Sequence, residues 1–211
     1  MEENKKKAIR LVLENTKKAL IKNGFKAEVC EGKEEAAEKI LSLIGEGKKV
    51  GMGGSVTVSQ LGLPERIISK NTIYAHKPQM STEERRKTWL ACMDSDFYLA
   101  SPQAVTSDGK LIFIDGTGNR CAALTWGPKH IILPAGYNKI VKDLQEGRIR
   151  MRQEAAIANN IRLNKKNPCV ISGKCEDCAS PDRICNIVTE IWKKPKISEY
   201  SVFLINEDLG Y

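Results

Sequence analysis

A glycine-rich turn carries the first side chains along the chain that could bind an anion. Gly53 and Gly54 follow a short apolar run, and Ser55 and Thr57 come directly after them. Glycine lets a ligand approach the backbone closely, and serine is a good N-cap, so the N–H groups of a helix that begins after Ser55 would face the ligand. The alternative interpretation is a tight strand-to-helix turn that binds nothing.

A second turn of the same kind contains more polar groups. It places a carboxylate, neutral hydrogen-bonding groups and a guanidinium at consecutive positions: Asp115, Gly116, Thr117, Gly118, Asn119 and Arg120. We expect Asp115 to act as a general acid or base, and Arg120 to bind a carboxylate or phosphate through two parallel hydrogen bonds. Alternatively, Asp115 and Asn119 only stabilise the turn.

Asn138 and Lys139 follow a third predicted strand and are further candidates for binding the ligand. A lysine near a strand end can face a site at the edge of a sheet. Lys139 could equally be a solvated lysine at the entry of a helix.

Four of the seven cysteines lie within residues 169–185, namely Cys169, Cys175, Cys178 and Cys185. In a reducing compartment such a cluster favours a metal over disulfides, and four thiolates suit tetrahedral zinc or an iron–sulfur cluster. The spacing differs from the ferredoxin and zinc-ribbon patterns, so unliganded thiols and a redox disulfide are alternatives. The other cysteines, Cys30, Cys92 and Cys121, lie in apolar segments and are expected to be buried free thiols.

The glycine turns do not match known nucleotide or hydrolase fingerprints. Val56 stands where a dinucleotide-binding loop needs its third glycine, Lys70 stands where it needs an acid, and no Walker A lysine follows Gly54. The first turn also lacks the closing glycine of a nucleophile elbow. We expect both histidines, His76 and His130, to be structural.

Composition indicates a globular protein of the cytoplasm. Of the 211 residues, 41% are hydrophobic and 28% charged. No apolar run is long enough for a membrane span, and no signal-peptide core follows the N-terminus. The net charge of +8 invites a nucleic-acid partner, but the 34 basic residues are spread among 26 acidic ones without a recognition motif. This distribution favours a solvated basic surface.

The spacing of apolar residues predicts the main elements. Helices are predicted over 4–23, 33–44 and 82–93, with another containing Pro64 and a fifth after Arg120. A long helix is predicted from Ile140 to about Leu163, with Arg148, Arg150 and Arg152 as a solvated run. Strands are predicted at 25–30, 48–52, 73–75, 97–100, 129–134 and 200–205, with a hairpin over 104–114 around an Asp-Gly turn.

Strands that alternate with helices predict an α/β fold with a mostly parallel sheet flanked by helices, to which the hairpin adds an antiparallel piece. No linker or internal repeat is present, so residues 1–211 are expected to form one domain that includes a Cys-rich loop over 164–190. Ligands of parallel sheets bind at the carboxyl ends of the strands. We therefore expect both glycine turns to line one crevice.

Several motifs taken together resemble the LUD domain family, the lactate-utilisation proteins of the YkgG/LutC type. The motifs lie at 53–57, 61–63, 115–124, 127–129, 135–141, 169–186 and 207–211. The resemblance implies the fold shared by ribose-5-phosphate isomerase, glucosamine-6-phosphate deaminase and CoA transferases. In those proteins a Gly/Ser/Thr loop holds phosphate or carboxylate, which matches residues 53–57 here. The isomerases also use an acid in an Asp-Gly turn, to which Asp115 is similar.

The resemblance implies a role in lactate oxidation, where some family members act within a complex that contains iron–sulfur proteins. Our first hypothesis is an enzyme or enzyme subunit that acts on a small anionic metabolite, such as a hydroxy acid or phosphorylated compound. The second is a metal-bearing electron-transfer or regulatory subunit of an organic-acid oxidation complex, with oxidoreductase partners. A third is an anion sensor. The sequence leaves open the substrate, the metal and the oligomeric state, a homo-oligomer included.

Overall fold

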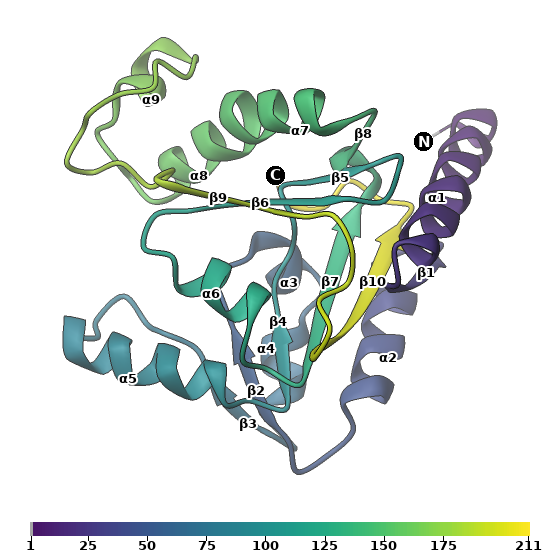
Figure 1. Ribbon diagram of the computed structural model, residues 1–211, viewed down its shortest axis with the longest axis horizontal. Helices are drawn as coiled ribbons and strands as arrows, with labels where there is room; N and C mark the ends of the chain where they lie inside the picture. Colours follow the sequence, from purple (N-terminus) through teal and green to yellow (C-terminus); the bar gives the residue numbers. More distant parts are fainter. Residues whose placement is uncertain (1) are drawn as a thin grey trace.

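The computed structural model describes residues 2–211 and contains two β-sheets (Figure 1). The larger sheet has six strands, and every neighbouring pair in it is parallel. Their order across the sheet is β1 (Lys26–Cys30), β10 (Glu199–Ile205), β7 (His130–Gly136), β4 (Phe97–Leu99), β2 (Lys49–Met52) and β3 (Thr72–Tyr74). The predicted α/β fold with a parallel sheet is therefore confirmed.

Helices cover both faces of this sheet and bury its alternating side chains. One face packs against α1 (Glu3–Lys22), α5 (Thr82–Met93) and α6 (Asn119–Thr125), and the other against α2 (Lys33–Ile44), α3 (Val56–Gln60) and α4 (Leu63–Ile67). On β10, Val202 and Leu204 belong to the first core, whereas Phe203 and Ile205 belong to the second. This period of two follows from strand geometry and makes the sheet buried on both sides.

The predicted hairpin lies in a second sheet of its own. The expectation that it would add an antiparallel piece to the parallel sheet is therefore wrong. The order of strands in the second sheet is β8 (Ile140–Val141), β5 (Ala104–Thr106), β6 (Leu111–Asp115) and β9 (Ile187–Ile191). A small apolar core joins this sheet to the helices that follow β8, through residues such as Ile112, Val141 and Met151. In Figure 1 these helices lie above β5 and β6, on the side away from the large sheet.

The predicted long helix over residues 140–163 is wrong at its start and interrupted within. Residues 140–141 form β8, and α7 (Leu144–Arg150) begins only after Asp143, whose carboxylate accepts a hydrogen bond from Glu146 N at 3.0 Å. A π-helical turn, η2 (Met151–Ala155), then leads into α8 (Ala156–Arg162). Gly147 is buried where α7 crosses Ile112, so the absence of a side chain permits this packing.

The Cys-rich loop contains more regular structure than the sequence predicted. A short helix, α9 (Pro168–Ser172), lies within it, and its last residues already belong to β9. Strand β9 escaped prediction because it lies at an edge of the second sheet, where Ile187 and Val188 remain exposed and give no alternating pattern.

Cys30, Cys92 and Cys121 are buried free thiols as predicted, and burial raises the pKa of Cys30 and of Cys92 to about 11. A 3₁₀ turn, η1 (Tyr137–Lys139), connects β7 to β8. Within residues 2–211, no helix combines the length and the apolar character needed to cross a membrane.

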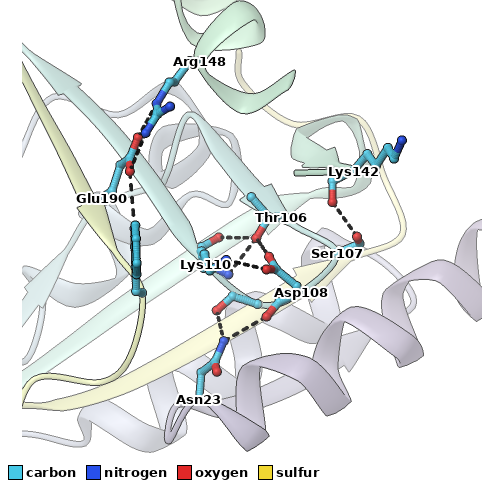
Figure 2. A network of polar contacts seen from close by, with 10 residues as sticks. Asn23, Thr106, Ser107, Asp108, Lys110, Lys142, Arg148 and Glu190 are labelled. Atoms are coloured by element: carbon cyan, nitrogen blue, oxygen red, sulfur yellow. Dashed lines mark hydrogen bonds and ion pairs between the residues drawn. The ribbon is translucent and has the colours of Figure 1, made fainter. Parts of the chain in front are cut away.

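The turn of the hairpin joins the second sheet to the end of α1 (Figure 2). Asn23 Nδ2 donates hydrogen bonds to the carbonyl oxygens of Asp108 and Gly109, each at 2.9 Å. Gly109 has a φ of +82°, and a Cβ atom there would lie 2.6 Å from the carbonyl carbon of Ala19. Gly109 is therefore required both by its backbone conformation and by the close approach of α1.

This close approach predicts that Gly109→Ala destabilises the protein more than a matched substitution at Gly47. Gly47 also has a positive φ, of +70°, but a Cβ atom there meets nothing within 4 Å. We expect Gly47→Ala to lower the free energy of unfolding by about 1 kcal/mol, and Gly109→Ala by about 3 kcal/mol, because only the second adds a steric clash to the backbone strain. Urea unfolding of both variants would measure the difference, and equal losses would contradict the proposed contact.

Candidate functional site

A polar pocket lies at the carboxyl ends of three neighbouring strands of the large sheet. Strand β2 leads to Thr57, β4 leads to Ser101, and β7 leads through η1 to Lys139. The pocket holds about 510 Å³ of empty space, including the part open to solvent. Its lining residues are Gly54, Ser55, Val56, Thr57, Ser101, Gln103, Ile114, Arg120, Lys139, Ala155, Ala156, Asn159, Arg162, Ile184 and Tyr211.

The first glycine turn forms one wall of this pocket. Ser55 Oγ accepts a hydrogen bond from Val58 N at 3.3 Å, as an N-cap should. The helix that it caps, α3, has only five residues, so its dipole contributes little. A Cβ atom at Gly53 would lie 2.5 Å from Arg120 Cδ. Gly53 therefore makes room for the Arg120 side chain, whereas Gly54 lines the pocket itself.

Lys139 is the most buried charged group of the site, with 2% of its surface exposed. Its Nζ donates hydrogen bonds to Thr57 Oγ1 at 2.9 Å and to Ser101 Oγ at 2.8 Å. Burial, and after it the guanidiniums of Arg150 and Arg120, lower the pKa of Lys139 to about 7, while Asp208 opposes them. The expectation that Lys139 lies near a strand end is met, and its alternative as a solvated lysine is wrong.

The second glycine turn uses its carboxylate within the turn. Asp115 is buried; its Oδ1 accepts a hydrogen bond from Gly116 N at 2.9 Å. Its Oδ2 accepts from Arg120 N at 2.9 Å and from Cys121 N at 3.2 Å. Asp115 therefore caps the start of α6 and is not among the residues that line the pocket. These contacts agree with the alternative that Asp115 stabilises the turn.

Arg120 is the part of the second turn that reaches the pocket. Its Nη2 donates to Ile114 O and lies 3.6 Å from Asp115 Oδ1. Thr117, Gly118 and Asn119 line a different groove, between α5 and α6, together with apolar side chains such as Trp89 and Leu90. The two turns thus converge through Arg120 alone, and the rest of the second turn faces elsewhere.

Asn138 holds the C-terminal segment in place. Its Oδ1 accepts a hydrogen bond from Leu209 N at 3.2 Å, and its Nδ2 donates to Gly210 O at 3.1 Å. Thr57 Oγ1 also donates to Leu209 O, at 3.3 Å. These bonds bring Tyr211 to the pocket, where it forms part of the lining. Asn138 therefore lies outside the pocket lining and holds in place the C-terminal segment that carries Tyr211.

Arg150 contradicts the prediction of a solvated arginine run on the long helix. Only 6% of its surface is exposed, and its pKa is lowered mainly by burial. Its Nε donates to Asn138 O at 2.8 Å and its Nη1 to Gln103 O. Arg150 thus connects α7 to two segments beside the pocket. Arg148 is exposed, as expected, and pairs with Glu190 at 2.6 Å (Figure 2).

The histidines lie outside the pocket lining. His130 Nε2 is 2.9 Å from Ser201 Oγ, and His76 Nδ1 accepts a hydrogen bond from Trp89 Nε1 at 3.3 Å. The pKa of each is lowered, mainly by burial. Both arrangements agree with structural histidines.

The four cysteines of the Cys-rich loop are half-buried, and none of them is among the residues that line the pocket. Arg183 organises the loop, donating to Cys178 O at 2.7 Å, to Cys185 O at 3.2 Å and to Asp177 Oδ1 at 2.8 Å. Asn186 fixes the loop to the second turn, with its Nδ2 donating to Gly116 O at 3.0 Å. Among residues 2–211, no three Cys, His, Asp or Glu side chains are arranged to hold a metal ion.

Several lining residues escaped the sequence predictions. Ser101 lies two residues after the end of β4, so the strand-end rule that selected Lys139 could have found it. Asn159 and Arg162 come from α8, and Tyr211 from the C-terminal segment, and all three reach the pocket only through tertiary packing. No local pattern in the sequence marks them.

Charge defines the chemistry of the pocket. Three basic side chains line it, namely Arg120, Lys139 and Arg162, and within the described part of the chain no Asp or Glu side chain does. The neutral groups of Ser55, Thr57, Ser101, Gln103 and Asn159 add hydrogen-bonding capacity. Such a pocket suits a small ligand with a carboxylate or phosphate, because guanidinium groups bind both through charge-assisted hydrogen bonds.

Comparison with known proteins agrees with this fold. The chain is similar to a DUF162 family protein from Deinococcus radiodurans, with 15% sequence identity and a TM-score of 0.55, covering 93% of this chain and 98% of that one. Human-curated proteins gave no match. A partial likeness to eIF2B beta from Chaetomium thermophilum covers 54% of this chain and 41% of that one, at 17% identity, and its TM-score of 0.40 is too low to support a conclusion.

The family is established by a match to the model of the LUD domain, which extends over residues 13–205 and so includes both glycine turns and the Cys-rich loop. The chain therefore belongs to the LUD domain family.

Proposed function

We propose that this protein is a lactate-utilisation-type LUD protein that binds a small anionic metabolite in the strand-end pocket and acts on it. The ligand would be a hydroxy acid or a phosphorylated compound. One observation carries the proposal: Arg120, Lys139 and Arg162 converge on a pocket that, within residues 2–211, no carboxylate side chain lines. Cations gathered in this way are stabilised by an anion.

The roles of the lining residues follow from their positions. Arg120 and Arg162 would bind the anionic group, since guanidiniums form forked hydrogen bonds with carboxylate or phosphate. Ser55 and Asn159 would hydrogen-bond a hydroxyl group of the ligand. Asp115, expected from the sequence as an acid or base, has no role in this proposal, because both of its oxygens accept backbone hydrogen bonds outside the pocket lining.

The proposal predicts that Arg162→Gln weakens anion binding about tenfold, because it removes a charge-assisted hydrogen bond worth about 1.5 kcal/mol. Among residues 2–211, the Arg162 side chain hydrogen-bonds only Asn159 Oδ1 of its own helix, at 2.8 and 3.0 Å, so the variant should keep its fold. Arg148→Gln is the matched control, an exposed arginine paired with Glu190 away from this pocket. Thermal shifts in titrations of inorganic phosphate and of lactate would measure affinity, and equal affinities in both variants would contradict the proposal.

The buried amine predicts a pH dependence of stability. The pKa of Lys139 is about 7 in the folded protein, whereas an unfolded lysine titrates near its ordinary 10.5. Between these values the unfolded chain binds a proton that the folded chain does not, so stability should rise with pH across this window. The charged groups that act on Lys139 are Arg150, Arg120 and Asp208.

The variant Lys139→Met should lack this dependence. In phosphate-free buffer, the free energy of unfolding of the wild type relative to the variant should rise by about 1 kcal/mol per pH unit between about pH 7 and about pH 9. Urea unfolding at each pH would measure it. Parallel pH profiles for the two proteins would mean that Lys139 remains protonated in the folded state.

We propose as a second candidate function that the Cys-rich loop binds zinc or an iron–sulfur cluster, as in a metal-bearing subunit of an organic-acid oxidation complex. Four half-buried thiols on one loop carry this proposal, and Cys175 and Cys185 line a common small cavity. Since no three metal-ligating side chains of residues 2–211 are arranged for a metal, the loop would have to draw its thiols together when the metal binds.

Anaerobic purification followed by elemental analysis tests this second candidate. We expect either one zinc per chain, or iron and sulfide with visible absorbance, and loss of either metal in Cys178→Ser. Cys30→Ser is the control, because that thiol is buried in the core away from the loop. If the purified protein contains neither metal, the second candidate function is wrong and the loop has only a structural role.

A further inference from the structure

We propose that Lys139 is a catalytic residue, a neutral amine that forms a Schiff base with the carbonyl group of an anionic substrate held in the strand-end pocket. The substrate class would be an oxo acid, or an aldehyde that carries a carboxylate or phosphate. This inference deepens the proposed function and rests on it, because the anion must first bind among the arginines of the pocket.

The hydrogen bonds of Lys139 fit a neutral amine better than an ammonium ion. Nζ has two partners in the described chain, Thr57 Oγ1 and Ser101 Oγ, and both are hydroxyl oxygens. A neutral amine has two N–H groups and one lone pair, so two accepting hydroxyls satisfy its donors. An ammonium ion would have a third N–H, and a buried charge needs an anionic partner, which neither hydroxyl provides.

The surroundings of Lys139 also oppose a positive charge on it. Its side chain is 2% exposed, and the guanidiniums of Arg150 and Arg120 act on it from α7 and α6. Asp208, in the C-terminal segment, is the acid that opposes them, yet burial and both arginines still lower the pKa to about 7. About half of the lysine would then be neutral at neutral pH, against roughly 1 in 3,000 for an exposed lysine.

The pocket places this amine next to groups that select the substrate. Lys139 shares the lining with Arg120 and Arg162, so an anion bound by the arginines would bring its remaining atoms toward the amine. Seclusion from bulk water favours the loss of water that forms an imine. Proximity of a carbonyl and an amine in one small pocket is itself a large part of the catalytic effect.

The proposed step balances without a cofactor. The Nζ lone pair attacks the carbonyl carbon, and the C=O π electrons move to oxygen. One proton moves from nitrogen to that oxygen and gives a carbinolamine. The C–O bond then breaks and the hydroxyl leaves as water with the second proton of the amine nitrogen, while the nitrogen lone pair forms the C=N bond of a neutral imine. The hydroxyls of Thr57 and Ser101, at 2.9 and 2.8 Å from Nζ, are placed to pass these protons.

Reductive trapping of the full-length protein tests the inference. The probe is glyoxylate, which combines an aldehyde with a carboxylate, in the presence of cyanoborohydride, which reduces an imine to a stable carboxymethyl amine. Peptide mass spectrometry then compares the labelling rates of individual lysines. At neutral pH we expect Lys139 to be labelled at least about tenfold faster than the exposed Lys142, because far more of it is neutral.

Two controls distinguish the reactivity of the Lys139 amine from the binding of the anionic group by the pocket. Acetaldehyde, which lacks the carboxylate, should label Lys139 at least about tenfold more slowly than glyoxylate does, and inorganic phosphate should compete with glyoxylate. In Lys139→Arg, which keeps a long basic side chain but has no amine that can form an imine, the preferential labelling should vanish while labelling of Lys142 stays unchanged. A circular dichroism spectrum of the variant would verify its fold.

The outcomes distinguish this inference from the proposed function. If phosphate stabilises the wild type in a thermal shift but Lys139 is labelled no faster than Lys142, the Schiff base is excluded and the anion site stands. If phosphate and lactate do not bind and Lys139 is not labelled, both proposals fail. If acetaldehyde and glyoxylate label Lys139 equally fast, the amine is reactive but the selection of an anionic carbonyl compound is wrong.

Discussion

The hydrogen bonds between Lys139 and the hydroxyls of Thr57 and Ser101 hold together the region on which the pocket depends. These residues follow β7, β2 and β4, which are adjacent in the large sheet. A buried polar group that loses its partner is costly, so each of the three connections is constrained by the other two. The bottom of the pocket is therefore determined by three strand ends at once, which is the arrangement that parallel strands favour.

The cover of the pocket comes from segments that lie far away in the sequence. Helix α8 contributes Arg162, the Cys-rich loop contributes Ile184, and the C-terminal segment contributes Tyr211. Arg150 connects the carbonyl groups of Asn138 and Gln103, so α7 is joined directly to the connections that follow β4 and β7. The second sheet and its helices thus complete a site that the large sheet alone would leave open.

The two glycine turns illustrate how similar residue patterns serve different purposes. In the first turn, Gly54, Ser55 and Thr57 line the pocket, as the pattern suggested. In the second, three backbone N–H groups bind Asp115, which makes its carboxylate part of the turn. A carboxylate after a strand can cap a helix or face a ligand, and the sequence contains no signal that separates these uses.

The sequence determined the α/β class, most helices and strands, and the identity of the strand ends, because these depend on local periodicity and turn chemistry. It also indicated Lys139 and Arg120, since Lys139 lies near the end of a predicted strand and Arg120 within a predicted turn. Only the tertiary structure decided that the hairpin forms a second sheet, that Arg150 is buried, and that α8 and Tyr211 complete the pocket. These features depend on contacts between distant segments, whose energies no local window of sequence contains.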